Sequence, residues 1–226
     1  NDTGVYEGGD ISMYYDPMIA KLCTWAPTRA EAIEQMRVAL DSFEVEGIGH
    51  NLPFLSAVMD HPIFINGDMT TAFIAEEYPD GFEGVELPEG ELRRIAAATS
   101  AMHRVAEIRR ARVSGRMDNH ERKVGSDWNV AIQGQSFDVT IEADQDGATV
   151  NFADGEALRV SGDWTPGDQL ATMTVADAPL ILKVGKISGG FRVRTRGADL
   201  RVHVRTPRQA ELALMMPEKV APDTSR

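Results

Sequence analysis

The feature that most constrains the fold of this chain is an alternation of apolar and polar residues that runs from residue 128 to residue 204. A period of two places every second side chain on one face of a β-strand. Short turn-forming pairs such as Gly134-Gln135 and Asp154-Gly155 interrupt it, which predicts antiparallel hairpins. The apolar positions of the eight predicted strands are Trp128, Val130, Ile132; Phe137, Val139, Ile141; Val150, Phe152; Leu158, Val160; Met173, Val175; Leu180, Leu182, Val184; Phe191, Val193; and Leu200, Val202, Val204.

Eight short strands with one apolar face need a way to cover their edges. Closing the sheet on itself removes both edges at once. The connection at Pro166-Gly167 is the exception to these short hairpin turns. The pattern therefore predicts an up-and-down antiparallel β-barrel over residues 127–206.

A long helix is predicted before the barrel, over residues 88–113. Glu89 and Glu91 lie near its start and Arg109 and Arg110 near its end, the charge order that the helix dipole favours. Its first half is rich in small apolar residues around the whole circumference, so we expect that half to be buried on most sides. The residues alone do not place this helix, because side chains can fill an eight-stranded barrel unaided.

The region before the helix alternates apolar strands with amphipathic helices. Residues 18–25 form a predicted buried strand that contains Cys23, which we interpret as a structural thiol. Thr28-Arg29-Ala30-Glu31 is a capping box that predicts a helix start, Pro53 fits the first turn of a second helix, and Thr70 or Thr71 can cap a third. These elements predict an α/β layer over residues 1–82.

Composition excludes several function classes. A formal net charge of −12 over 226 residues opposes binding to a nucleic-acid backbone. No apolar run approaches the roughly 20 residues of a membrane span, and a single cysteine suggests a reducing compartment, either the cytoplasm or the mitochondrial matrix. The five histidines stand apart from Cys or carboxylates at metal-ligand spacing, and no nucleophile elbow or phosphate-binding loop is present. We therefore predict no metal site and no catalytic residue.

Several short motifs carry a resemblance to a known family. The segment Tyr14 to Lys21 and the segment Gly47 to Asn51 resemble the C-terminal lobe of biotin carboxylase, an ATP-grasp enzyme. The segment Tyr78 to Phe82, together with Ala210-Glu211-Leu212 and Glu218-Lys219-Val220, resembles the biotin-bearing α subunits of the propionyl-CoA carboxylase family of biotin-dependent acyl-CoA carboxylases.

The resemblance implies an α+β fold: the C-terminal part of a biotin carboxylase domain over 1–82, then a bridging (BT) domain over 83–216, in which the barrel wraps around one long central helix. Residues 217–226 would be a linker toward a biotinyl carrier, whose Met-Lys-Met attachment motif does not occur here. The intact subunit is expected to use ATP with Mg and bicarbonate to carboxylate biotin, so most of the cofactor sites would lie outside this chain.

Site residues also follow from the resemblance. Phe73 matches a position that packs against the adenine ring, although a core residue on a helix face is equally consistent with the sequence. The connection 114–126 matches a hook that docks on the carboxyltransferase β subunit in an α6β6 assembly; the alternative is a disordered loop. The expected interface residues are Arg116, Met117, Asn119, His120 and Arg122.

Cationic residues gather near the end of the predicted barrel. Their side chains should lie on the face opposite the apolar positions, where they form either a solvated wall or a docking surface for an acidic partner. They are Arg192, Arg194, Arg196, Arg201 and Arg205.

Two other functions stay open at this point. The chain could belong to another acyl-CoA carboxylase, such as one of the methylcrotonyl-CoA type, because acyl selection belongs to the β subunit. It could also be a non-catalytic barrel that binds a small ligand in its interior. A helix that fills the barrel would leave no such cavity, so the position of the helix separates these alternatives.

Overall fold

The computed structural model describes residues 1–11, 14, 18–114 and 122–216. The chain divides into two compact units. The first contains Asn1–Glu86 and Arg194–Asp199, and the second contains Leu87–Val193 and Leu200–Arg226. Each unit is described by itself below.

The barrel of the second unit confirms the predicted eight antiparallel strands. They close in the order β10-β3-β4-β5-β6-β7-β8-β9, in which each strand neighbours its sequence neighbours and β10 pairs with β3. The predicted apolar positions face the core; Val130, Val150 and Val202, for example, are 0% exposed. The strands are β3 (Asp127–Ile132), β4 (Gln135–Ala143), β5 (Ala148–Phe152), β6 (Ala157–Gly162), β7 (Leu170–Val175), β8 (Ala178–Ile187), β9 (Gly190–Thr195) and β10 (Ala198–Arg205).

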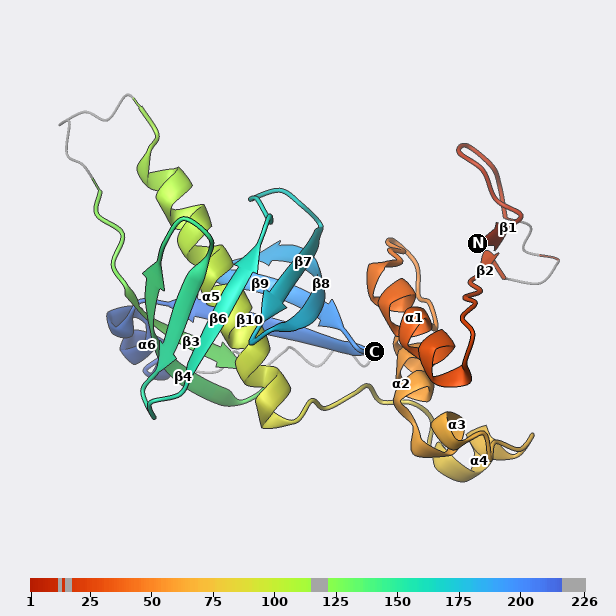
Figure 1. The fold of residues 1–226 in the computed structure, drawn as a ribbon. Coiled ribbons are helices and arrows are strands. Elements are labelled where there is room, and N and C mark those ends of the chain that lie inside the picture. The colour runs from red at the N-terminus through yellow and green to blue at the C-terminus, as the bar shows by residue number, and fades with distance from the viewer. Residues whose placement is uncertain (12–13, 15–17, 115–121, 217–226) are drawn as a thin grey trace, which may run out of the picture. The chain divides into compact units, whose positions relative to one another are not determined.

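The long helix α5 (Glu89–Ala111) runs through the barrel (Figure 1). It contacts β3, β4, β5, β6 and β7. Ile95, Ala96 and Ala97 are fully buried, and Met102 is 1% exposed. Small side chains at these positions let the helix approach the strands closely. The central position that the family resemblance implied is therefore confirmed.

Two arginines hold the first turns of α5 in place. Arg93 pairs with Asp154 (2.5 Å) and Glu156 (2.8 Å) of the β5–β6 turn, and its guanidinium lies over the rings of Phe137 and Phe152. Arg94 donates to the backbone carbonyls of Ala178 (3.2 Å) and Pro179 (2.9 Å). Charge-assisted bonds of this kind fix the rotation of the helix as well as its depth.

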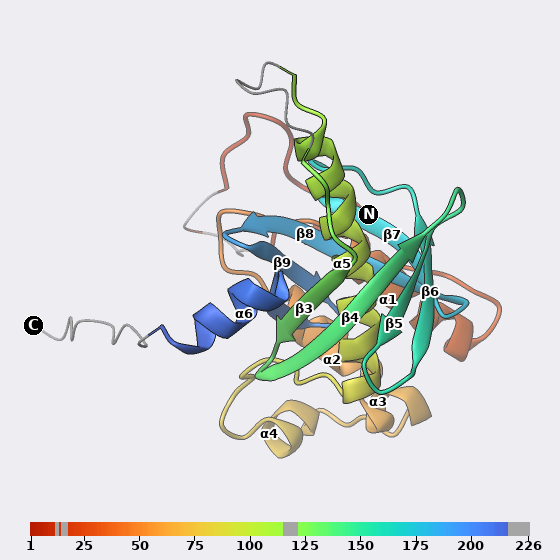
Figure 2. The same cartoon turned by 90° about the vertical axis from the view of Figure 1, so that its left-hand side faces the viewer.

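The helix α6 (Pro207–Leu214) follows β10, contacts β3 and lies outside the barrel (Figure 2). Our sequence analysis did not predict it. The signal was present, because the Thr206 hydroxyl accepts from the Gln209 amide and the Gln209 side chain accepts from the Thr206 amide. This is a capping box with Pro at the first helical position.

The first unit is mainly helical. The capping box at Thr28 is confirmed, since its hydroxyl accepts from the Glu31 amide and the Glu31 carboxylate accepts from the Thr28 amide. The second helix begins at Leu52 beside the predicted Pro53. The elements of the first unit are β1 (Asp2–Thr3), β2 (Ala20–Lys21), α1 (Arg29–Ser42), α2 (Leu52–Asp60), α3 (Pro62–Asn66) and α4 (Phe73–Glu77).

The prediction of a buried strand over residues 18–25 is wrong. Only Ala20–Lys21 is paired, with Asp2–Thr3, in a two-stranded sheet. Cys23 is exposed rather than a buried thiol, and Trp25 is 80% exposed. A buried strand needs covering layers on its faces, and the described residues of this unit do not provide them.

Candidate functional site

Phe73, the predicted nucleotide contact, lies in an aromatic cluster of the first unit. Its ring meets His61 edge to face at a centroid distance of 5.0 Å and Tyr78 at 6.1 Å. Phe54 and Phe82 extend the cluster through Tyr78. Only 4% of Phe73 is exposed, so the described residues leave no open ring face for an adenine.

The polar edge of this cluster is a contact between an imidazole and a carboxylate. His61 Nε2 lies 3.3 Å from a Glu77 carboxylate oxygen. Burial, together with the negative charge of Glu77, raises the pKa of the neighbouring Tyr78 hydroxyl. The packing favours the core interpretation of Phe73, while its nucleotide contact stays a prediction. No step of ATP chemistry follows from these residues.

The predicted partner connection 114–126 is described in part. Arg116, Met117, Asn119 and His120 lie outside the described residues. Arg122 is described, and it donates to the carboxylate of Glu107 on α5. The same carboxylate accepts from Arg110 at 2.5 Å.

Sequence reasoning missed Glu107. Its side chain is almost fully buried although it is charged, a combination that requires partners. One sequence signal could have identified it. An acid close to the C-terminal end of a helix opposes the helix dipole, so it needs a specific cation nearby.

His103 lies one helical turn before Glu107 on α5, and its ring packs against barrel side chains. Its ring meets Trp128 edge to face at 4.9 Å and Phe191 at 6.3 Å. Burial lowers the pKa of His103; Glu107 opposes that shift, while Arg110 and Arg122 add to it. We therefore assign the neutral imidazole to the folded state at neutral pH.

The five barrel arginines do not form one free cationic face. Arg194 and Arg196 belong to the first unit, where Arg194 pairs with Glu44 at 2.6 Å and the Arg196 amide donates to Asp41 at 2.7 Å. Arg201 is exposed and Arg205 is half-buried. Glu44 thus neutralises the charge of Arg194, which we interpreted as part of a solvated wall or a docking surface.

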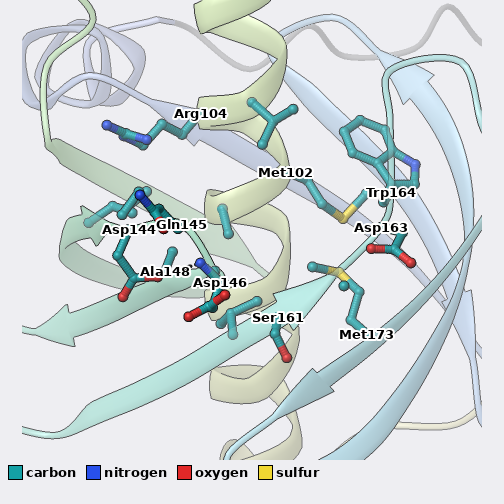
Figure 3. Close-up of a pocket in the computed structure, with 17 residues that line it drawn as sticks. Met102, Arg104, Asp144, Gln145, Asp146, Ala148, Ser161, Asp163, Trp164 and Met173 are labelled. Atoms are coloured by element: carbon teal, nitrogen blue, oxygen red, sulfur yellow. Dashed lines mark hydrogen bonds between the residues drawn. The ribbon is translucent and has the colours of Figure 1, made fainter.

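A cleft of about 650 Å³ opens beside α5 between the β4–β5 turn and the start of the β6–β7 loop. In Figure 3, Met102, Trp164 and Met173 lie on one side of it and Arg104 and Asp144 on the other. Arg159 binds the Asp144 carboxylate through two nitrogens and lowers its pKa to about 2. Phe73 and Arg122, the sequence-predicted site residues that the structure describes, do not line this cleft.

Neither a cluster of metal ligands nor a membrane-spanning helix occurs in the part of the chain that the structure describes. There, no group of three or more His, Cys, Asp or Glu side chains is placed to hold a metal ion. The helices of those ranges are also too short or too polar to cross a bilayer. The candidate sites among the described residues are the aromatic cluster, the Glu107 region, the cleft beside α5 and a second cleft of about 630 Å³ lined by β3, β4, β10 and α6.

Two family models match the chain in the order of its two units. Residues 1–76 match the biotin carboxylase C-terminal domain, and residues 95–219 match the propionyl-coenzyme A carboxylase BT domain. The second match covers the barrel and most of α5. The chain therefore belongs to the propionyl-coenzyme A carboxylase BT domain family.

Curated relatives agree with this assignment. The chain is 80% identical over 226 residues to the propionyl-CoA carboxylase alpha chain of Ruegeria pomeroyi, covering 100% of this chain and 33% of the relative. It is 34% identical over 232 residues to the mitochondrial propionyl-CoA carboxylase alpha chain of Rattus norvegicus. That alignment covers 99% of this chain and 31% of the relative. The mitochondrial methylcrotonoyl-CoA carboxylase subunit alpha of Dictyostelium discoideum is 44% identical over 100 residues. That alignment covers 44% of this chain and 14% of the relative. The chain thus spans about one third of the length of its full-coverage relatives.

Proposed function

We propose that this chain is part of an α subunit of propionyl-CoA carboxylase. The intact enzyme would use ATP with Mg and bicarbonate to carboxylate biotin, which would carry the carboxyl group to propionyl-CoA on a carboxyltransferase β subunit. The observation that carries this proposal is the 80% identity to the Ruegeria pomeroyi alpha chain along the whole of these 226 residues. Biotin and most of the ATP site would belong to parts of the subunit outside this chain.

Within that subunit, this segment would mainly scaffold the contact with the β subunit in an α6β6 assembly. The barrel interior is filled by α5, with Ile95 and Ala98 fully buried, so the barrel has a structural core instead of an internal active site. The connection 114–126 would supply the partner contact through Arg116 and Met117, residue types that are enriched in interface cores. The setting would be the cytoplasm or, in a eukaryote, the mitochondrial matrix.

The alternatives are weaker on specific observations. A methylcrotonyl-CoA enzyme is disfavoured because that relative aligns over only 44% of the chain, whereas the propionyl-CoA relatives align over 99% or more. A barrel that binds a ligand in its interior is disfavoured because α5 occupies that space.

Coexpression tests the scaffold role. A full-length α subunit that carries this segment is purified with the β subunit and analysed by size exclusion. The double change Arg116→Ala and Met117→Ala is expected to dissociate the assembly. The matched control, Arg208→Ala with Met216→Ala, alters an exposed Arg and an exposed Met on and just beyond α6 and should retain it. Full assembly of the first variant would overturn the proposed role of the connection.

Activity measurements test the assignment of the catalytic parts. The chain of 226 residues by itself is expected neither to hydrolyse ATP in a bicarbonate-dependent manner nor to carboxylate free biotin. Phosphoryl transfer needs metal ions held beside the phosphates, and the described residues contain no group of three or more His, Cys, Asp or Glu side chains placed to hold one. Bicarbonate-dependent ATP turnover by this chain would contradict the proposal.

A further inference from the structure

The second cleft lies on the outer face of the barrel, between α6 and the strands β10, β3 and β4. Its volume of about 630 Å³ lies in the range that is typical of small-molecule sites. Helix α6 contacts β3 and forms one wall of the cleft (Figure 2). That wall is largely apolar, with Pro207, Ala210 and Leu214 lining the cleft.

The facing wall, on β10, is cationic. Arg201, His203 and Arg205 alternate with buried valines, so their side chains lie on the outer face of the strand. All three line the cleft. Antiparallel pairing places His203 opposite Ala131 and Arg205 opposite Asn129 of β3. The small side chain of Ala131 beside His203 leaves space above the strands there.

The arginines and the acids of this cleft differ in their partners. Among the described residues, neither Arg201 nor Arg205 has a hydrogen-bond or ion-pair partner. Glu211 lines the cleft too, but it pairs with an arginine of its own helix at 2.8 Å. Asp138 accepts a hydrogen bond from the side-chain amide of Asn129 at 2.8 Å. Both carboxylates therefore have a donor already, whereas the two guanidinium groups lack an acceptor.

The imidazole of His203 lies within the electrostatic field of both arginines. Burial and the positive charges of Arg205 and Arg201 lower the pKa of this group. Its Nδ1 atom is buried and has no hydrogen-bond partner within the described ranges. A bound anion would offset the positive charge that gathers along this wall.

We propose that this cleft binds a small organic oxyanion, either a phosphate ester or a polycarboxylate, through the guanidinium groups of Arg201 and Arg205. A guanidinium can donate two parallel hydrogen bonds to one phosphate or carboxylate. The side-chain amides of Gln133 and Gln135 also line the cleft and can add neutral donors. The apolar wall of α6 would contact the carbon skeleton of the ligand. This site goes beyond the proposed function and does not depend on it.

NMR titration of the 226-residue chain tests the proposal. Pyrophosphate stands for phosphate esters and citrate for polycarboxylates, and each is added separately at constant ionic strength in metal-free buffer. The ring signals of His203 should shift in a saturable manner with at least one of the two probes. The ring signals of His103, which packs against Trp128 and Phe191, should not move. The probe that binds more tightly identifies the ligand chemistry.

Variants assign the binding to the two arginines. Arg201→Gln and Arg205→Gln should each weaken the affinity by about fivefold, because each change removes one charged donor group. Asp138→Asn should strengthen it by about threefold, since it removes a negative charge from the lining of the cleft. Arg192→Gln is the matched control: Arg192 is an exposed arginine of β9 that does not line the cleft, and its replacement should change the affinity less than about 1.5-fold. A thermal melt of each variant controls for folding.

Three outcomes would overturn the inference. The first is that neither probe shifts the ring signals of His203. The second is an equal loss of affinity in Arg192→Gln and Arg201→Gln, which would mean that the anion responds only to the overall charge of the barrel. The third is tighter binding of a glutamate-rich peptide than of both small anions, which would make the cleft a docking surface for an acidic protein. Assembly with the β subunit is tested separately, by the changes at Arg116 and Met117.

Discussion

The barrel strands and the first half of α5 bury most of their apolar side chains, whereas the first unit leaves many of its own in contact with solvent. In the barrel, Ile95, Val130 and Leu182 are fully buried. In the first unit, Tyr14 is 91% exposed and Trp25 is 80% exposed. Isolated exposed apolar residues are common, but several large ones in one small unit are not.

The contrast arises because the sheet of the second unit is closed and the described sheet of the first unit is not. A closed barrel has no edge strand, and α5 fills its interior, so one continuous segment completes a core. The described sheet of the first unit has two strands of two residues each, which is too little to be stable by itself. We therefore expect the stability of the first unit to depend on further protein, and that of the barrel not to.

The largest expected effect concerns Ile95 at the centre of α5. Ile95→Ala removes fully buried apolar volume and should lower the free energy of unfolding by about 2–5 kcal/mol. Trp25→Ala, a larger truncation in the exposed part of the first unit, should change it by less than about 0.5 kcal/mol. Urea unfolding of the 226-residue chain measures both. Equal losses would mean that the two units do not differ in the way described above.

The next effect is overpacking of the same helix. Replacing Ala97 or Ala101 by Leu should cost roughly 1–3 kcal/mol, with the larger cost at Ala97, because Ala97 is 0% exposed whereas Ala101 borders the cleft beside α5. Ala30→Leu on α1, where the alanine is exposed, serves as the control and should leave the melting temperature unchanged within about 2 °C. Native stability of both barrel variants would place α5 outside the barrel.

A smaller effect separates the two interpretations of Phe73. In an intact subunit, Phe73→Leu keeps an apolar side chain in the cluster but removes the ring, and it should weaken nucleotide binding by on the order of 1 kcal/mol if the ring contacts adenine. Isothermal titration with nucleotide measures this, and a thermal melt of the same variant controls for folding. Unchanged nucleotide affinity would assign Phe73 to the core alone.

The smallest effect is a pH dependence that belongs to the barrel. Burial lowers the pKa of His103 below the roughly 6.5 of an unfolded histidine, so the unfolded chain binds the proton first as the pH falls. This contribution to stability is complete above pH 6.5 and is lost as the pH falls from there toward the folded pKa. His103→Gln should flatten that part of the profile in urea unfolding between pH 7 and 5. The pKa of His203 is also lowered by burial, so His203→Gln should flatten the profile in the same direction, and the double variant should flatten it more than either single change.

The alternation of apolar residues and the turn residues predicted the barrel well, because both depend on residues that are close together in the sequence. Helix α5 spans 89–111 against a predicted 88–113, and every predicted apolar strand position is buried. Helix α6 was missed although Thr206 and Gln209 form a capping box, because the helix is only eight residues long and none of its residues is buried. The predicted strand over 18–25 was wrong because apolar composition shows only that a segment favours burial. It does not show whether other helices or strands pack on that segment and bury it.

The candidate sites were less predictable, since they depend on residues that meet only after folding. Nothing in the sequence joins Glu107 to Arg122, or Arg93 to Asp154 and Glu156. The sequence did indicate that the connection 114–126 is longer than a helix-to-strand link usually needs.

By itself, the sequence determined the strands, their antiparallel order and the length of the central helix, because periodicity, turns and caps act over a few residues. Only the tertiary structure decided that the helix lies inside the barrel, that Phe73 is enclosed by His61 and Tyr78, and that Glu107 ties the connection to α5. These features arise from burial, which forces distant charged and aromatic side chains to find partners once water is excluded.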